Sequence, residues 1–176
     1  MRIWEMPRGF TLLEQLITLT VFSILLTAAI PAFKKMFEAH KMRRLANQFH
    51  HFMIYSKSQA VLNRERLWAH IIRPERGITQ GNWRIELTNH SKPEMGRVLS
   101  SFSGQDFTGI VVSFHYVSDQ ISFDGVHGRP SSGNIRFYSQ TSSEQALKVI
   151  SHTLSSRVRI CSDHPTQKYL SYPLCL

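Results

Sequence analysis

One acidic side chain, Glu14, lies in a run of apolar residues near the N-terminus. From Phe10 to Phe33 no other residue carries a formal charge. An isolated ionised group near an apolar phase is costly, so it usually has a partner of opposite charge. A cut after Gly9 would give Phe10 a free ammonium group, and residues i and i+4 share one face of a helix. The cut would therefore create, in this chain or a neighbouring one, the cation that the acid needs.

Two basic side chains near the C-terminus, Arg157 and Arg159, form a second candidate site. On a strand, alternate side chains share a face, which places the two guanidinium groups together, about 7 Å apart. Such a pair suits phosphates along a nucleic-acid backbone, because each group can make bidentate, charge-assisted contacts. Val158 and Ile160 would then point to the core. The alternative interpretation is a solvated strand face without a ligand.

Two cysteines, Cys161 and Cys175, both lie close to the C-terminus. In an exported protein an even pair suggests a disulfide, whose loop of about 15 residues would add on the order of 3 kcal/mol by chain entropy. The bridge would fold the tail back on the last strand and fix a cationic loop beside it. Weaker candidates for phosphate contact are Lys148, Arg136 and Lys168, and the tail offers Tyr169 and Tyr172 as stacking surfaces for exposed bases.

The apolar run from Phe10 to Phe33 is long enough to cross a membrane. As a helix it measures roughly 36 Å at about 1.5 Å per residue, which exceeds the roughly 30 Å hydrocarbon core of a bilayer. A plain single-span anchor and a secretory signal peptide cut near Thr27-Ala28-Ala29 are the alternatives. The run is longer than a signal peptide's apolar segment of roughly 7–15 residues, and Glu14 is misplaced in one. Basic residues flank the run on both sides, so their count does not give the orientation.

Residues 34–66 have the apolar stripe of an amphipathic helix that continues the first one. The stripe recurs mostly at steps of three and four: Met42, Leu45, Phe49, Phe52, Met53 and Ala60. Pro31 removes one backbone donor and is expected to kink the helix nearby. His50-His51 is interpreted as a solvated pair and not as a metal site, because adjacent side chains diverge on a helix.

After Arg66 the apolar period changes to two, which is typical of strands. About eight short segments rich in β-branched and aromatic residues are separated by turn residues. The predicted strands are Leu67–Ile72, Trp83–Thr88, Val98–Phe102, Ile110–Val117, Gln120–Asp124, Ile135–Ser139, Leu147–Leu154 and Arg157–Cys161. The predicted fold class is therefore α+β, with a long N-terminal helix (transmembrane, then amphipathic) packed on a C-terminal antiparallel β-sheet or sandwich.

The charge of the chain lies after the apolar run. The sequence has 21 Lys+Arg and 12 Asp+Glu, a net charge of +9, and the charges before residue 34 cancel. A domain this basic is drawn to polyanions such as nucleic acid, anionic lipid or acidic glycans. The sequence shows no nucleophile elbow, Walker-type phosphate loop or zinc-helix motif. We therefore predict no enzyme, no metal site and no cofactor.

The stretch Gly9-Phe10-Thr11-Leu12-Leu13-Glu14, followed by an apolar helix with Pro31, resembles the class III leader and first helix of type IV pilins and pseudopilins. The resemblance implies that a membrane-embedded prepilin peptidase cuts between Gly9 and Phe10 and methylates Phe10. It places the N-terminus in the cytoplasm, the helix in the inner membrane as a single-pass anchor, and the C-terminal domain in the periplasm. The helix would then pack with other pilins into a filament core, with Glu14 acting in assembly.

The implied organisation has four parts: a leader at 1–9, a transmembrane and filament-core helix at 10–33, an amphipathic helix at 34–66, and a β-rich periplasmic or extracellular domain at 67–176. The order of long helix, β-rich domain and late Arg157-x-Arg159-x-Cys161 resembles the GspH/FimT group of minor pilins and pseudopilins. In FimT-type minor pilins a Gly-Arg-x-Arg-x-Cys motif is associated with DNA binding during natural transformation. Here Ser156 stands where the glycine would be, and a turn that needs a positive φ is less easy with serine.

Two hypotheses follow. In the first, the protein is a minor pilin at or near a pilus tip that binds DNA without sequence preference through Arg157 and Arg159. In the second, it is a structural subunit, either a type II secretion pseudopilin or a minor pilin that primes assembly, and its surfaces bind other pilins. The positive charge favours the first.

Overall fold

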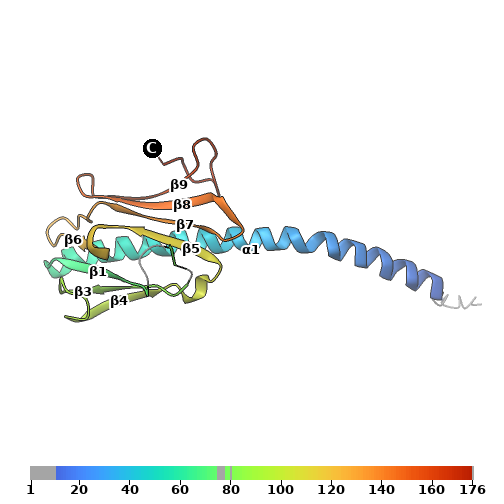
Figure 1. Ribbon diagram of the computed structural model, residues 1–176, viewed down its shortest axis with the longest axis horizontal. Helices are drawn as coiled ribbons and strands as arrows, with labels where there is room; N and C mark the ends of the chain where they lie inside the picture. Colours follow the sequence, from blue (N-terminus) through green and yellow to red (C-terminus); the bar gives the residue numbers. More distant parts are fainter. Residues whose placement is uncertain (1–10, 75–77, 80, 176) are drawn as a thin grey trace, which may run out of the picture. The chain divides into compact units, whose positions relative to one another are not determined.

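In the part of the chain that the structure describes, one long helix precedes the strands (Figure 1). The computed structural model describes residues 11–74, 78–79 and 81–175. In order, the elements are α1 (Leu12–Asn63), β1 (Leu67–Ile72), β2 (Ile78–Thr79), β3 (Arg84–Thr88), β4 (Val98–Ser103), η1 (Gln105–Phe107), β5 (Ile110–His115), η2 (Val117–Asp119), β6 (Gln120–Phe123), β7 (Gly133–Ser139), β8 (Ser142–His152) and β9 (Arg157–Ser162). The chain divides into two compact units, Met1–Glu38 and Ala39–Leu176.

Local hydrogen bonds explain where α1 begins and ends. The Thr11 hydroxyl accepts a hydrogen bond from the Glu14 backbone N–H at 3.3 Å, which caps the first turn. At the other end Arg64 has a φ of 52°, and its N–H donates to the Val61 carbonyl at 3.2 Å. A left-handed residue after the last turn stops a helix by turning the chain back on its final carbonyls. The helix therefore ends at Asn63, three residues before the predicted boundary at 66.

The described part of the first unit is the apolar half of α1. Its large apolar side chains are exposed, among them Leu12, Leu16, Phe22, Ile24 and Phe33. By length and composition the helix could cross a membrane. Pro31 lies within the continuous helix.

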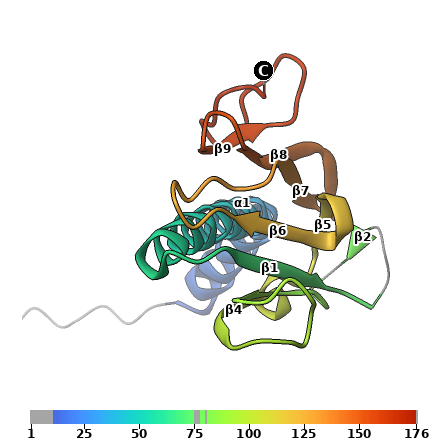
Figure 2. The same cartoon turned by 90° about the vertical axis from the view of Figure 1, so that its left-hand side faces the viewer.

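Two antiparallel sheets make up the second unit together with the rest of α1. The smaller sheet has the strand order β4-β3-β1-β6, and the larger sheet has the order β2-β5-β7-β8-β9, which Figure 2 shows from β2 to β9. The prediction of one long helix packed on antiparallel β-structure is confirmed. Seven of the predicted strands agree with the structure to within two residues at each end, whereas β8 begins at Ser142, five residues earlier than predicted. The two-residue strand β2 was not predicted, because Ile78–Thr79 is too short to show a period.

The predicted apolar stripe of the helix lies in the core. Met42, Leu45, Phe49 and the rest of the stripe are all buried. Phe49 stacks on Trp83 of the segment before β3, with the ring centroids 5.2 Å apart, and lies 5.6 Å from Phe137 of β7. One helix face therefore joins both sheets in a shared core.

The larger sheet has one face in this core and one face turned away from it. Val112, Phe137 and Val149 lie on the inner face and are buried. Pairing places Ser113 opposite Arg136, and Arg136 opposite Lys148, on the other face. On β8 and β9 the pairs on that face are Lys148–Cys161, Ile150–Arg159 and His152–Arg157. We call this the outer face, and it carries four of the five predicted phosphate-binding residues.

Candidate functional site

The two arginines of β9 lie on the outer face, as their spacing predicted. Arg157 and Arg159 are exposed, whereas Val158 and Ile160 are partly buried against the core. The two arginines line a cavity of about 290 Å³ together with Ile150, His152 and Ser155. We call this cavity the arginine pocket. It combines guanidinium, imidazole and hydroxyl donors around one aliphatic side chain, which suits an anionic oxygen group.

The turn before β9 has the backbone that a glycine would favour. Ser156 has a φ of 51° and its N–H donates to the Thr153 carbonyl at 3.4 Å. The Lys57 ammonium donates to the Ser156 carbonyl at 2.6 Å, which ties the turn to α1. A left-handed conformation costs an L-residue roughly 1–2 kcal/mol. Ser156 thus adopts a positive φ that a glycine would adopt at a lower cost.

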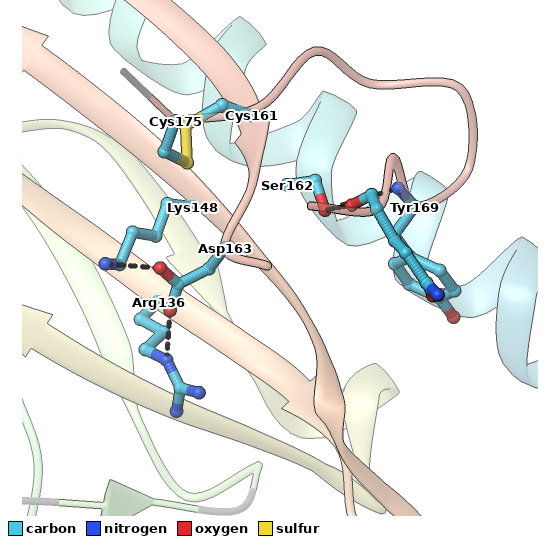
Figure 3. The surroundings of a disulfide bond; sticks show 8 residues. Arg136, Lys148, Cys161, Ser162, Asp163, Tyr169 and Cys175 are labelled. Carbon is cyan, nitrogen blue, oxygen red and sulfur yellow. Dashed lines mark hydrogen bonds and ion pairs between the residues drawn. A yellow bond between two sulfur atoms is a disulfide. The ribbon is translucent and has the colours of Figure 1, made fainter. Parts of the chain in front are cut away.

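The other two cations of the outer face, Arg136 and Lys148, share one acid. Arg136 Nε donates to Asp163 Oδ2 and Lys148 Nζ to Asp163 Oδ1, each at 2.6 Å (Figure 3). The side chains of Arg136, Lys148 and Asp163 are 32%, 27% and 22% exposed. Partial burial by itself raises the pKa of Asp163, but the hydrogen bonds and charges of Lys148 and Arg136 outweigh it and hold the pKa below its ordinary value. We call this group the clamped pair.

A disulfide between Cys161 and Cys175 holds the tail against the end of β9. The Ser162 N–H donates to the Pro173 carbonyl at 2.7 Å, and the Cys175 N–H donates to the Ser162 carbonyl at 3.1 Å. The Ser162 hydroxyl donates to the Gln167 carbonyl at 3.0 Å and accepts from the Tyr169 N–H at 3.2 Å. The backbone just before Asp163 is therefore held by the disulfide and by the hydrogen bonds of Ser162.

The tail residues proposed for nucleic acid lie elsewhere than predicted. Tyr169 and Tyr172 are partly buried against the core, and the Tyr172 hydroxyl donates to Asn47 Oδ1 of α1 at 3.3 Å. The expectation of open stacking surfaces was wrong, because the disulfide loop uses both rings to pack on the domain. Lys168 is exposed in the tail, and among the described residues no hydrogen bond or ion pair joins it to the outer face.

The N-terminal candidates are described only in part. Gly9 and Phe10 lie outside the described residues. Glu14 is exposed in the first turn of α1, and its backbone N–H donates a hydrogen bond to the capping hydroxyl of Thr11. Within the described part of the chain, no three His, Cys, Asp or Glu side chains gather as a metal site.

Sequence comparison decides the family. Residues 45–163, more than half of the chain, match the type II transport protein GspH. The chain belongs to the GspH family. Residues 6–30 of this GspH-family chain also match the prokaryotic N-terminal methylation motif. No curated protein sequence matches the chain.

Two solved structures of a type IV minor pilin share the fold of the GspH-family chain. The type IV minor pilin FimU of Pseudomonas aeruginosa (strain PAO1), in space group P21, is 11% identical with a TM-score of 0.56, and the match covers 76% of this chain and 96% of FimU. FimU in space group P65 is 9% identical with a TM-score of 0.52, over 67% of this chain and 90% of FimU. The minor pseudopilin EpsH from the type 2 secretion system of Vibrio cholerae is 10% identical with a TM-score of 0.48, over 72% and 99%.

The two family matches bear out the resemblance to the GspH/FimT group. The chain is a pilin or pseudopilin of the GspH family, whose members assemble with other pilins in a filament, and its N-terminal apolar helix is long and apolar enough to anchor it in a membrane. At such low identities the solved structures show the fold alone.

Proposed function

We propose that this protein is a minor pilin that binds DNA without sequence preference during natural transformation, with Arg157 and Arg159 as the main phosphate contacts. One observation supports this most: the two arginines line one cavity on the exposed side of an edge strand. The net charge of +9 adds a long-range attraction for a polyanion. Two neighbouring guanidinium groups bind phosphate oxygens regardless of the base, which fits uptake of DNA of any sequence.

We also propose that a prepilin peptidase cuts between Gly9 and Phe10 in the inner membrane and methylates Phe10, with the leader in the cytoplasm and residues 67–176 in the periplasm. The match of residues 6–30 to the methylation motif supports this. The new ammonium would pair with Glu14 and let the helix pack beside other pilins. Mass spectrometry of protein recovered from cells should find a chain that begins at methylated Phe10. A chain that begins at Met1, or at Ile30, would contradict the proposal.

DNA binding is tested with full-length protein in a non-ionic detergent, by gel-shift titration at 50 to 200 mM salt. Arg157→Gln with Arg159→Gln should weaken binding by more than about tenfold and reduce the slope of log affinity against log salt by about one per lost phosphate contact. The matched control, Arg43→Gln with Arg97→Gln, removes the same charge from exposed positions elsewhere and should have a much smaller effect. Equal losses of DNA affinity in both variants would mean that the protein attracts DNA by its overall charge and not through Arg157 and Arg159.

The second candidate function is a structural role, as a type II secretion pseudopilin or an assembly-priming minor pilin. The match of residues 45–163 to a type II transport protein favours it. Deletion would then abolish secretion or piliation. Loss of DNA uptake with pili intact would instead support the first proposal.

A further inference from the structure

We propose that Asp163 competes with nucleic-acid phosphate for Arg136 and Lys148, so that this pair contacts DNA only when the acid is displaced. The proposal rests on the DNA-binding function proposed above and gives the outer face a residue that limits its affinity. Asp163 would act as an internal counter-ion that determines how many cations of the face a polyanion can use.

Strand alternation places Asp163 on the same face as the arginines of β9. The residues at 157, 159, 161 and 163 follow one another at steps of two, and alternate residues of a strand share a face. The Asp163 N–H donates to the Ala146 carbonyl at 2.9 Å, so the pairing of β9 with β8 continues one residue past Ser162. The carboxylate therefore lies at one end of the outer face and the arginine pocket at the other.

The contacts of Asp163 are those that a phosphate would make. Each carboxylate oxygen takes one cation, with Arg136 Nε and Lys148 Nζ both at 2.6 Å. Carboxylates and phosphates both accept charge-assisted hydrogen bonds from guanidinium and ammonium groups. The two cations remain about 30% exposed, so an incoming polyanion can reach them but meets a negative charge that already uses their donors.

The backbone holds the acid in place independently of its ion pairs. The disulfide at Cys161 lies two residues before it, and Ser162 is hydrogen-bonded through its N–H, carbonyl and hydroxyl. Removing the carboxylate charge should therefore leave the shape of this end of the sheet intact. The charge of the acid and its two cations would rise from +1 to +2, and both cations would become available to phosphate.

The test uses full-length protein in non-ionic detergent and one duplex oligonucleotide, titrated at several salt concentrations. Asp163→Asn should raise the affinity about tenfold at 50 mM salt and steepen the salt slope by about one to two units, because each added phosphate contact contributes about 0.9. Asp106→Asn is the matched control. Asp106 also pairs with an arginine, Arg44 at 3.3 Å, but its side chain is 76% exposed, and this change should leave the slope unaltered.

Removing the pair separates a local effect from general charge. Arg136→Gln with Lys148→Gln in the parent chain should cost less than about threefold in affinity, against more than about tenfold for Arg157→Gln with Arg159→Gln. Adding Asp163→Asn to the pair variant should not raise the affinity above that of the parent. If Asp163→Asn fails to fold, the pair variant still tests the proposal, because it keeps the acid in place. A loss of affinity as large as that of Arg157→Gln with Arg159→Gln would overturn the proposal.

The outcomes distinguish the two proposals. If the parent does not bind DNA, or the Arg157 and Arg159 variant binds as the parent does, the function proposed above fails. If that variant weakens binding while Asp163→Asn changes neither affinity nor slope, only the role of Asp163 is overturned. It is also overturned if losing Arg136 and Lys148 weakens binding as much as losing Arg157 and Arg159.

Discussion

The outer face of the larger sheet holds its cations in two different ways. At one end Arg157 and Arg159 line an open cavity, and at the other Arg136 and Lys148 are held by Asp163. The same face and the same residue types thus give one concave surface lined by two arginines and one surface whose two cations share a single acid. The difference teaches that an acid placed beside two basic residues by the fold, as Asp163 is here, reduces how much of their charge a ligand can use.

The largest effect is expected where the tail supports the clamped pair. Cys161→Ser with Cys175→Ser should lower the free energy of unfolding by about 3 kcal/mol. The reason is that the bridge closes a loop of about 15 residues and so reduces the entropy of the unfolded chain. Urea denaturation of the two forms measures the difference. An unchanged midpoint would mean that the tail, and with it the position of Asp163, is held without the disulfide.

The clamped pair should matter more for stability, whereas the two arginines of the pocket should matter more for DNA binding. Arg136→Met with Lys148→Met should destabilise the domain by about 1–2 kcal/mol, because the partly buried Asp163 loses both of its partners. Arg157→Met with Arg159→Met should stay within about 0.5 kcal/mol, as expected for exposed positions. Urea denaturation of this matched pair of variants is the measurement, and equal values would remove the distinction between the two ends.

A glycine at position 156 should stabilise the turn before the arginine pocket. Ser156→Gly removes the cost of a left-handed side chain and should raise the free energy of unfolding by about 1 kcal/mol. Ser155→Gly is the control, because Ser155 has no positive φ, and it should be neutral or destabilising. A loss of stability in Ser156→Gly would mean that the serine side chain contributes more than its backbone costs.

The smallest effect is a dependence on pH. The pKa of Asp163 lies below its ordinary value of 3.8, so its ionised form stabilises the folded state above that value, and this contribution is lost as the pH falls through the folded pKa. The difference in unfolding free energy between the parent and Asp163→Asn should be constant above about pH 5 and shrink as the pH falls below about 4. A difference that stays constant down to pH 2 would contradict the ion pairs.

Period and spacing predicted much of this molecule. The helical stripe from Met42 to Ala60 is buried as expected, and β1 has the predicted bounds. The alternation in β9 placed Arg157 and Arg159 correctly, because an edge strand with one buried face obeys a strict period of two. The end of α1 was missed because its left-handed terminator is an arginine, and no glycine marks it.

The clamped pair was missed for a different reason. The predicted strand stopped at Cys161, so the next outward position, Asp163, was not considered with the arginines. One further step of the same period would have found it on that face. Its partners Arg136 and Lys148 could not be found in this way, because they depend on the register in which β7, β8 and β9 pair. No local sequence pattern predicts that register. The packing of Tyr169 and Tyr172 likewise depends on where the disulfide loop folds.

The position of β9 at the edge of the larger sheet affects how the subunit can associate with its neighbours in a filament. A border strand with unpaired backbone groups invites a strand from another chain, which leads to uncontrolled association. The tail covers only the end of this border, through the bridge between Ser162 and Leu174, and charged side chains on the rest discourage such pairing. Arg157 and Arg159 would therefore help the subunit to associate through its helix and not through its sheet, whatever else they bind.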